Sequence, residues 1–193
     1  MRNHYSFSEL IKTIYSLIMT KLTMPQARLI RRPIYVRGAK SIMGAKNLTT
    51  GRFCRFDLDG TNPTLSIGDN CEMGDMTHIV ALANVKIGKN VLIASKCFIS
   101  DTSHGFYFGI DASSPDTPPS SRALFSGKVV IGDNVWIGEN VVILSGAEIG
   151  DGCIVGANSV ISKKIPENCI VVANNQILKI YDYYRQEWVS KNK

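Results

Sequence analysis

One of the three histidines in this sequence stands where a regular pattern is interrupted. The histidines are His4, His78 and His104. Because an imidazole ordinarily has a pKa of about 6.5, its neutral form takes a proton from a hydroxyl group at physiological pH. His104 opens a stretch, residues 105–128, that holds much of the chain's proline together with Gly, Ser and aromatic residues. An isolated histidine is more often structural, but this position makes His104 a candidate general base.

Charged residues near His104 offer possible partners for its imidazole. Asp101 lies three residues earlier and either orients the imidazole, contacts an acceptor or caps a turn, and the sequence leaves these roles open. Asp111 and Asp116 are alternative orienting groups within the loop. Arg122 either binds an acidic group of a substrate or pins the loop, and pinning is the more ordinary use of such a residue.

The five cysteines do not indicate a metal cluster, a disulfide framework or a nucleophile beside His104. Their number is odd and none forms a C-x-x-C pair, which fits a reducing cytoplasm. Three of them occupy positions where the pattern described next requires a small residue, so they are expected to be inert core thiols. The cysteines are Cys54, Cys71, Cys97, Cys153 and Cys169.

Aliphatic side chains recur every six residues, with a two-residue phase shift before Ile87 and a long gap after Ile99. They are Ile67, Met73, Ile79, Ile87, Ile93, Ile99, Ile131, Ile137, Ile143, Ile149, Val155 and Ile161. This period describes short strands joined by tight turns, in coils of about eighteen residues stacked about 4.8 Å apart. A helix does not explain it, because a period of 3.6 residues drifts away from six. The pattern predicts an all-β solenoid.

The repeat also divides the chain. Val36, Ile42 and Leu48 keep the six-residue step, so we expect the solenoid over residues 30–173, with an extruded loop at 105–128. The N-terminal segment 1–29 contains an amphipathic helix at residues 7–22, which either caps an end of the solenoid or attaches to a membrane surface. Residues 174–193 are expected to form a helical tail.

The formal charge of +6 favours anionic partners such as nucleotide phosphates, nucleic acid or an anionic membrane surface. Basic residues are densest over residues 28–46, but no RNA-binding signature accompanies them, so a nucleic-acid partner is not expected. The N-terminal segment lacks both the long apolar run of a spanning helix and a small-residue cleavage site. We therefore expect a cytoplasmic protein, with work at the inner face of the membrane as a possibility.

The segment IGDNVWIGENVVILSGAEIGDGCIVGANSV resembles the hexapeptide-repeat acyltransferases, and the resemblance implies a left-handed parallel β-helix. The stretches ASKCFISDTSHG, PPSSRALFS and VWIGENVVIL are most similar to the O-antigen and lipopolysaccharide O-acetyltransferase branch. His104 holds the position of that family's catalytic base, ahead of the segment at 129–138. Thr102 replaces a second histidine that is common in the branch, and Met76 falls near a family acceptor contact.

The resemblance implies direct acetyl transfer from acetyl-CoA to a sugar hydroxyl of a surface polysaccharide precursor, O-antigen or capsule. The acceptor would be nucleotide- or lipid-linked, and the active site would lie between the subunits of a homotrimer. The expected acetyl-CoA contacts are Trp136, Gly138, Glu139, Gly156, Ala157, Ser162, Lys163 and Lys179. Trp136 precedes an inward Ile and should therefore point outward.

Four other functions are compatible with a solenoid of this kind. N-acetylation of an amino sugar nucleotide or acetylation of serine would use the same fold and donor. A non-catalytic scaffold would bind no acetyl-CoA. A zinc enzyme of the γ carbonic anhydrase type would need three histidines, whereas only His78 and His104 lie within the coils, so no metal is expected.

Overall fold

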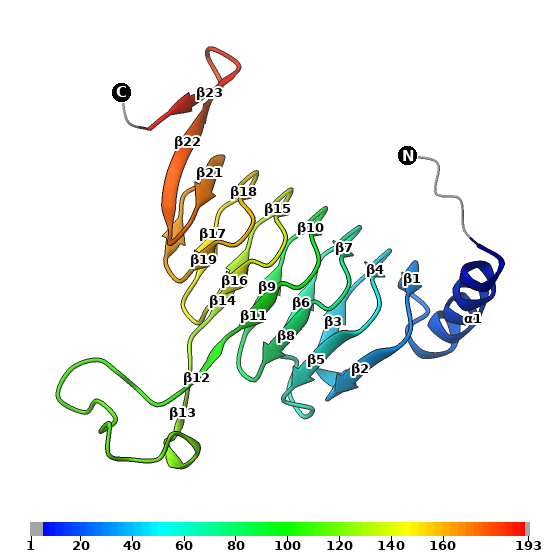
Figure 1. Ribbon diagram of the computed structural model, residues 1–193, viewed down its shortest axis with the longest axis horizontal. Helices are drawn as coiled ribbons and strands as arrows, with labels where there is room; N and C mark the ends of the chain where they lie inside the picture. Colours follow the sequence, from blue (N-terminus) through cyan, green and yellow to red (C-terminus); the bar gives the residue numbers. More distant parts are fainter. Residues whose placement is uncertain (1–5, 192–193) are drawn as a thin grey trace.

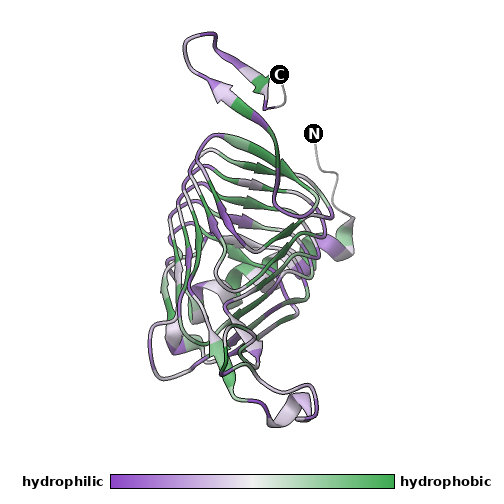
Figure 2. Ribbon diagram, turned by 90° about the vertical axis from the view of Figure 1, so that its left-hand side faces the viewer, coloured by the Kyte–Doolittle hydropathy of each residue, from purple (hydrophilic) through white to green (hydrophobic). Residues whose placement is uncertain are grey.

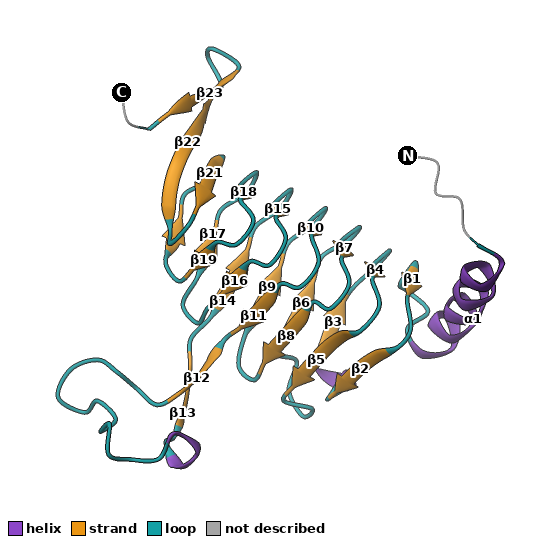
Figure 3. Cartoon of the chain, in the orientation of Figure 1, coloured by secondary structure: helices purple, strands orange, loops and turns teal. Residues whose placement is uncertain are grey.

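The computed structural model describes residues 6–191 as one helix followed by a parallel β-solenoid (Figures 1 and 3). Sheet A, with nine strands, contains β1 (Leu29–Ile30), β4 (Thr49–Thr50), β7 (Glu72–Met73), β10 (Leu92–Ile93), β15 (Trp136–Ile137), β18 (Ile154–Val155), β21 (Cys169–Val172), β22 (Gln176–Asp182) and β23 (Glu187–Ser190). Sheet B contains β2 (Ile34–Arg37), β5 (Cys54–Leu58), β8 (His78–Ala81), β11 (Phe98–Ser100), β16 (Val142–Ile143) and β19 (Val160–Ile161). Sheet C contains β3 (Ile42–Gly44), β6 (Leu65–Ile67), β9 (Val85–Ile87), β14 (Val129–Ile131), β17 (Glu148–Ile149) and β20 (Lys164–Ile165).

The six-residue repeat fills the interior of the solenoid, as the sequence predicts. In sheet C, Ile67, Ile87 and Ile131 pair directly across parallel strands, and all three are buried. Each inward position therefore stacks on its counterpart in the next coil, and Figure 2 shows hydrophobic residues recurring along the stacked strands. Val36 differs, being 37% exposed, because β2 is the edge strand of sheet B and no further strand covers it.

The corners of the coils use residues that tolerate a left-handed backbone. Asn70, Asn90 and Asn134 have φ between 55° and 61°, and their side-chain amides hydrogen-bond to one another at 3.0–3.2 Å. Asparagine adopts this conformation more readily than most residues because its short side chain bonds locally. The resulting ladder ties successive corners together along the solenoid.

Helix α1 (Phe7–Thr23) packs against the first coil through small polar residues rather than through its apolar side chains. Thr20 and Ser16 are buried, and their hydroxyls accept hydrogen bonds from the backbone N–H groups of Ile30 (2.8 Å) and Arg32 (3.2 Å). An apolar stripe therefore remains exposed on the side away from the coils: Phe7, Leu10, Ile11, Ile14, Ile18 and Leu22. Among the described residues, no helix is long and apolar enough to span a membrane.

The C-terminal tail is a β-hairpin, so the prediction of a helical tail over residues 174–193 is wrong for the described part. Strand β22 pairs antiparallel with β21, and β23 pairs antiparallel with β22. Tyr181 packs against Trp188 across the hairpin, with ring centroids 5.3 Å apart. The last coil leaves the edge of β21 unpaired, and β22 supplies the hydrogen-bond partners that this edge requires. Residues 192 and 193 lie outside the described residues.

Candidate active site

The predicted loop leaves the solenoid at the corner between sheets B and C, on a short antiparallel hairpin. Strands β12 (Thr102–His104) and β13 (Leu124–Ser126) form this hairpin, and it lifts the rest of the loop away from the coils (Figure 1). A 3₁₀ turn, η2 (Pro119–Ser121), lies within the loop. His104 pairs with Leu124 at the outer end of the hairpin. The candidate base is therefore held by a strand rather than by an irregular loop.

The side chain of His104 is exposed, whereas its backbone is held in place. The Tyr107 hydroxyl donates a hydrogen bond to the His104 carbonyl, and Arg122 in turn donates to the Tyr107 oxygen at 2.9 Å. Arg122 also donates to the Thr117 carbonyl at 2.9 Å. These contacts match the loop-pinning role of Arg122. Within residues 6–191 no polar group lies at hydrogen-bonding distance of the His104 ring, which leaves it open to a substrate.

Asp101 is completely buried, and its carboxylate is used to cap a turn. It accepts hydrogen bonds from the backbone N–H groups of residues 82–84 at 2.7–3.1 Å, and from the Thr102 hydroxyl at 2.6 Å. The turn at 82–84 carries the two-residue shift in the repeat. Asp101 thus joins this irregular corner to the base of the hairpin, and these contacts fit the turn-capping interpretation. In the loop, Asp116 bonds with Ser114, and neither Asp116 nor Asp111 contacts His104.

Trp136 and Lys179, which are predicted to contact acetyl-CoA, lie on one outward row of sheet A. Trp136 is 52% exposed, as its position before an inward Ile predicts. It pairs with Ile154, Ile154 with Ile170, and Ile170 with Lys179. At about 4.8 Å for each strand step, the row spans about 14 Å. An extended ligand lying across the strands would contact both of its ends.

The other residues predicted to contact acetyl-CoA lie at two different corners of the coils. Gly138 and Glu139 follow β15 and Gly156 and Ala157 follow β18, so these four residues stack at the corner between sheets A and B. A Cβ atom at Gly138 would lie 2.7 Å from the Ala157 nitrogen, which explains the glycine. Ser162 and Lys163 follow β19 at the corner between sheets B and C. Their backbone N–H groups donate to Asn175 Oδ1 at 2.8 and 3.2 Å.

Met76 lies at the corner between sheets A and B, with a φ of 60° and a side chain that is 51% exposed. His104 leaves from the opposite end of the sheet B strands. Within one chain the structure therefore does not bring Met76 beside His104, and it places the row on sheet A on a different side of the solenoid from the hairpin.

Sequence reasoning missed a charged cluster on the outward face of sheet B. Asp57 accepts from His78 Nε2 at 3.0 Å and from Arg55 Nε at 2.7 Å, and Arg37 lies 3.6 Å away. Burial alone would raise the pKa of Asp57. Hydrogen bonds from His78 and Arg55 and the nearby positive charges lower it by a larger amount, so the pKa lies below its ordinary value. The His78 ring also packs against Phe98, with centroids 5.2 Å apart.

The five cysteines are buried and free, as expected for core thiols. Burial raises the pKa of Cys54 and Cys153 to about 11, so neither thiol ionises near neutral pH. Within residues 6–191, no group of three His, Cys, Asp or Glu side chains is arranged to hold a metal ion. His4 lies outside the described residues.

Residues 128–163 match the family model of the bacterial transferase hexapeptide, six repeats. Over 190 residues the chain is 38% identical to WbbJ of Escherichia coli (strain K12), whose name describes a lipopolysaccharide biosynthesis O-acetyl transferase. This match covers 97% of the chain and 96% of WbbJ. The chain belongs to the hexapeptide-repeat acetyltransferases. Its place in this family accounts for the solenoid.

Solved structures share the fold. The hexapeptide-repeat acetyltransferase VCA0836 of Vibrio cholerae, in complex with acetyl-CoA, has a TM-score of 0.57 and 24% identity, and the match covers 93% of this chain and 94% of that one. A mutant of the AntD N-acyltransferase of Bacillus cereus, in complex with dTDP-4-amino-4,6-dideoxyglucose and coenzyme A, has a TM-score of 0.56 and 19% identity. That match covers 100% of this chain and 92% of AntD.

Proposed function

We propose that this acetyltransferase moves an acetyl group from acetyl-CoA to a sugar hydroxyl of a surface polysaccharide precursor, with His104 as the general base. The observation that carries the proposal is the exposed imidazole of His104 on a hairpin fixed at its base by Asp101 and at its outer end by Tyr107. The near full-length similarity to WbbJ supports a precursor of O-antigen or capsule as the acceptor.

The reaction is a direct transfer. One imidazole nitrogen of His104 takes the proton from the sugar hydroxyl while the hydroxyl oxygen attacks the thioester carbonyl. The carbon–sulfur bond then breaks, and the imidazolium returns the proton to the departing thiolate, which leaves an acetyl ester and free coenzyme A. General base catalysis of this kind contributes about 10²- to 10⁴-fold. The raised pKa values of Cys54 and Cys153 argue against an acyl-cysteine intermediate.

Acetyl-CoA is proposed to lie along the row from Trp136 to Lys179 and over the glycine corner at Gly138 and Gly156. The solved complex of VCA0836 with acetyl-CoA supports this choice of donor. Gly138 is itself buried beneath the next coil, so contacts of a pantetheine arm at this corner would come from Glu139, Gly156 and Ala157, which are at least partly exposed. Ser162 and Lys163 remain candidates through their side chains, because Asn175 already accepts from their backbone N–H groups.

The enzyme is proposed to act as a homotrimer. Because the hairpin of His104 and the row on sheet A lie on different sides of one solenoid, a second copy is required to bring base and donor together. A cyclic trimer places the hairpin of each subunit against the row of its neighbour. Mixed trimers of His104→Ala and Trp136→Ala subunits should then regain a fraction of the activity that each variant lacks, because some interfaces pair two intact surfaces.

The N-terminal helix is proposed to bring the enzyme to the cytoplasmic face of the inner membrane. Its exposed apolar stripe, together with Lys21 in the last turn, has the character of an interfacial helix. Deletion of residues 1–24 should abolish co-sedimentation with vesicles containing anionic lipid. Retention of full vesicle binding would contradict this role.

Transfer to an amine is the second candidate, and the similarity in fold to the AntD N-acyltransferase motivates it. The two reactions are distinguished by their products. Labelled acetyl-CoA is incubated with a panel of sugar nucleotides, lipid-linked oligosaccharides and serine, and the products are treated with hydroxylamine and analysed by mass spectrometry. An acetyl ester is cleaved by hydroxylamine, whereas an acetamide is stable, so a hydroxylamine-resistant product would replace the proposed function with N-acetylation.

A further inference from the structure

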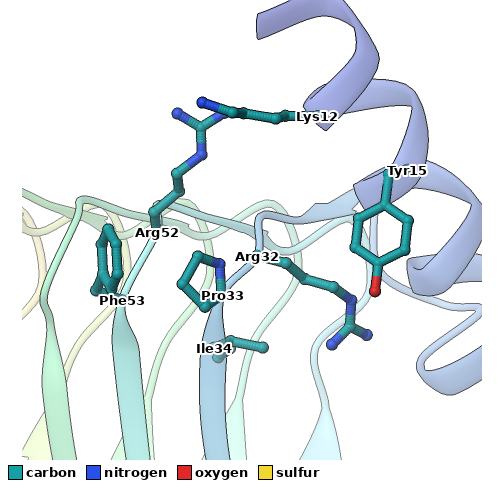
Figure 4. Close-up of a pocket in the computed structure, with 7 residues that line it drawn as sticks. All are labelled: Lys12, Tyr15, Arg32, Pro33, Ile34, Arg52 and Phe53. Atoms are coloured by element: carbon teal, nitrogen blue, oxygen red, sulfur yellow. The ribbon is translucent and has the colours of Figure 1, made fainter. Parts of the chain in front are cut away.

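A groove runs from helix α1 to the outward face of sheet B, away from the loop of His104. It consists of two adjoining cavities of about 620 and 560 Å³, which share Ile34 and Phe53. Figure 4 shows the first cavity, where Lys12 and Tyr15 project from α1 toward Arg52 and Arg32 of the first coils. We refer to the two cavities together as the N-terminal groove.

The N-terminal groove carries more positive than negative charge. Its lining holds five basic residues, Lys12, Arg32, Arg52, Arg37 and Arg55. Two carboxylates lie beside them, and each is shared between cations: Glu9 contacts Arg52 (2.8 Å) and Lys12 (3.5 Å), and Asp57 contacts Arg55 and Arg37. Even with both carboxylates ionised, three positive charges remain uncompensated in the groove.

Part of each of two arginines in the groove is enclosed by the protein. Within the described residues, the Nε atoms of Arg32 and Arg52 and the Oδ1 atom of Asp57 are buried and have no hydrogen-bond partner. Because these atoms are out of reach, an anion in the groove would contact the outer nitrogen atoms of the guanidinium groups. Arginine is the residue most suited to hold phosphate oxygens, because its planar donors match their geometry.

The aromatic residues of the groove add a surface for a sugar or an apolar chain. Tyr15, Tyr35 and Phe53 are 54%, 58% and 48% exposed, respectively, although all three are large apolar side chains. Exposed aromatic rings flanking cationic groups are typical of sites that bind a ligand with both a charged and an apolar part.

A row of outward residues on sheet B connects the groove to the strand that precedes the loop of His104. Tyr35, Arg55, His78 and Phe98 pair in register on adjacent strands of sheet B. Two strand steps, about 10 Å, separate Arg55 from Phe98. Strand β11, which contains Phe98, runs directly into the hairpin that ends at His104.

We propose that the N-terminal groove binds the pyrophosphate of a glycosyl pyrophosphate acceptor and directs its sugar along sheet B toward the His104 hairpin. This inference rests on the proposed function, because it names the chemical class of its acceptor. A pyrophosphate carries negative charge that balances the excess positive charge of the groove, whereas a free neutral sugar carries none. The group attached to the pyrophosphate is a nucleoside or a lipid, and binding experiments separate the two.

The experiment is isothermal titration calorimetry of the full chain with inorganic pyrophosphate, dTDP-glucose, farnesyl pyrophosphate and glucose. We expect the pyrophosphate compounds to bind at least 100-fold more tightly than glucose, and the tighter of dTDP-glucose and farnesyl pyrophosphate identifies the carrier. Equal binding of glucose would overturn the proposal.

Two variants and a matched control locate the site. The double substitution Arg37→Gln/Arg55→Gln and the single substitution Arg32→Gln should each raise the Kd for the bound probe at least tenfold. Arg185→Gln removes the same charge from the distant C-terminal hairpin and should leave the Kd within twofold. Equal binding by Arg32→Gln and Arg185→Gln proteins of the same melting temperature would refute the assignment.

The outcome is separable from that of the proposed function. His104→Ala protein should bind the probes as the unmodified chain does, because His104 does not line the groove. Acetyl transfer to free sugars with no pyrophosphate binding would refute the groove alone. Pyrophosphate binding without acetyl transfer to any acceptor would support the groove and refute the proposed function.

Discussion

Replacing Asp101 by asparagine should destabilise the solenoid strongly, because four donors converge on a carboxylate that is completely buried. Asparagine keeps one acceptor oxygen and turns an NH₂ group toward the other two donors. Leaving a buried donor unpaired costs about 1–3 kcal/mol, so two donors predict a loss of about 2–6 kcal/mol in the free energy of unfolding. The turn at 82–84 and the base of the hairpin should loosen together.

Urea unfolding followed by tryptophan fluorescence measures this loss, with Asp116→Asn in the exposed loop as the control. The control should change the free energy of unfolding by less than about 0.5 kcal/mol. The folded fraction of Asp101→Asn should keep the pH dependence of kcat/KM, because Asp101 does not contact the His104 ring. A change below about 0.5 kcal/mol for Asp101→Asn, or a shifted pH profile in folded protein, would refute this reasoning.

Contacts of the described residues give three further predictions. Tyr107→Phe removes the hydroxyl that joins Arg122 to the His104 carbonyl, so kcat should fall about 3- to 30-fold at an unchanged melting temperature, and full activity would exclude a positioning role for Tyr107. Because burial raises the pKa of Cys54 and Cys153, the native chain should react with Ellman's reagent at about pH 8 far more slowly than the chain in guanidinium; equal rates would show accessible thiols. The lowered pKa of Asp57 means that its ion pairs stabilise the fold above the ordinary range of aspartate and that this contribution is lost as the pH falls through the lowered pKa. Asp57→Asn should therefore flatten the acid side of a plot of melting temperature against pH, and an unchanged slope would contradict the assignment.

The sequence predicted the fold correctly where the six-residue repeat itself determines which side chains point into the solenoid. Ile87 and Ile131 stack in adjacent coils because the six-residue step gives each short strand an inward aliphatic residue at the same place. The prediction of a helical tail failed for the opposite reason: the conformation of β22 depends on the open edge of β21, which no local pattern reveals.

Parts of the site could not be predicted from the sequence, because they depend on contacts between residues in different coils. The donors to the Asp101 carboxylate in residues 82–84 lie 17–19 residues earlier in the chain, so the choice between capping a turn and orienting His104 required the register of the strands. Asp57 and His78 are 21 residues apart and meet only because β5 and β8 are neighbours. The sequence singles out His104 because it marks the interruption of the repeat, and its role as the base stays a prediction.

The most direct test of the account is acetyl transfer by His104→Ala protein. Labelled acetyl-CoA and the acceptor identified from the panel are incubated with each form, and melting temperature and acetyl-CoA affinity are measured on the same samples. If His104 is the general base, kcat should fall about 10²-fold or more, with the melting temperature and the acetyl-CoA affinity unchanged. A folded His104→Ala protein that transfers acetyl groups within about threefold of the unmodified rate would contradict this role.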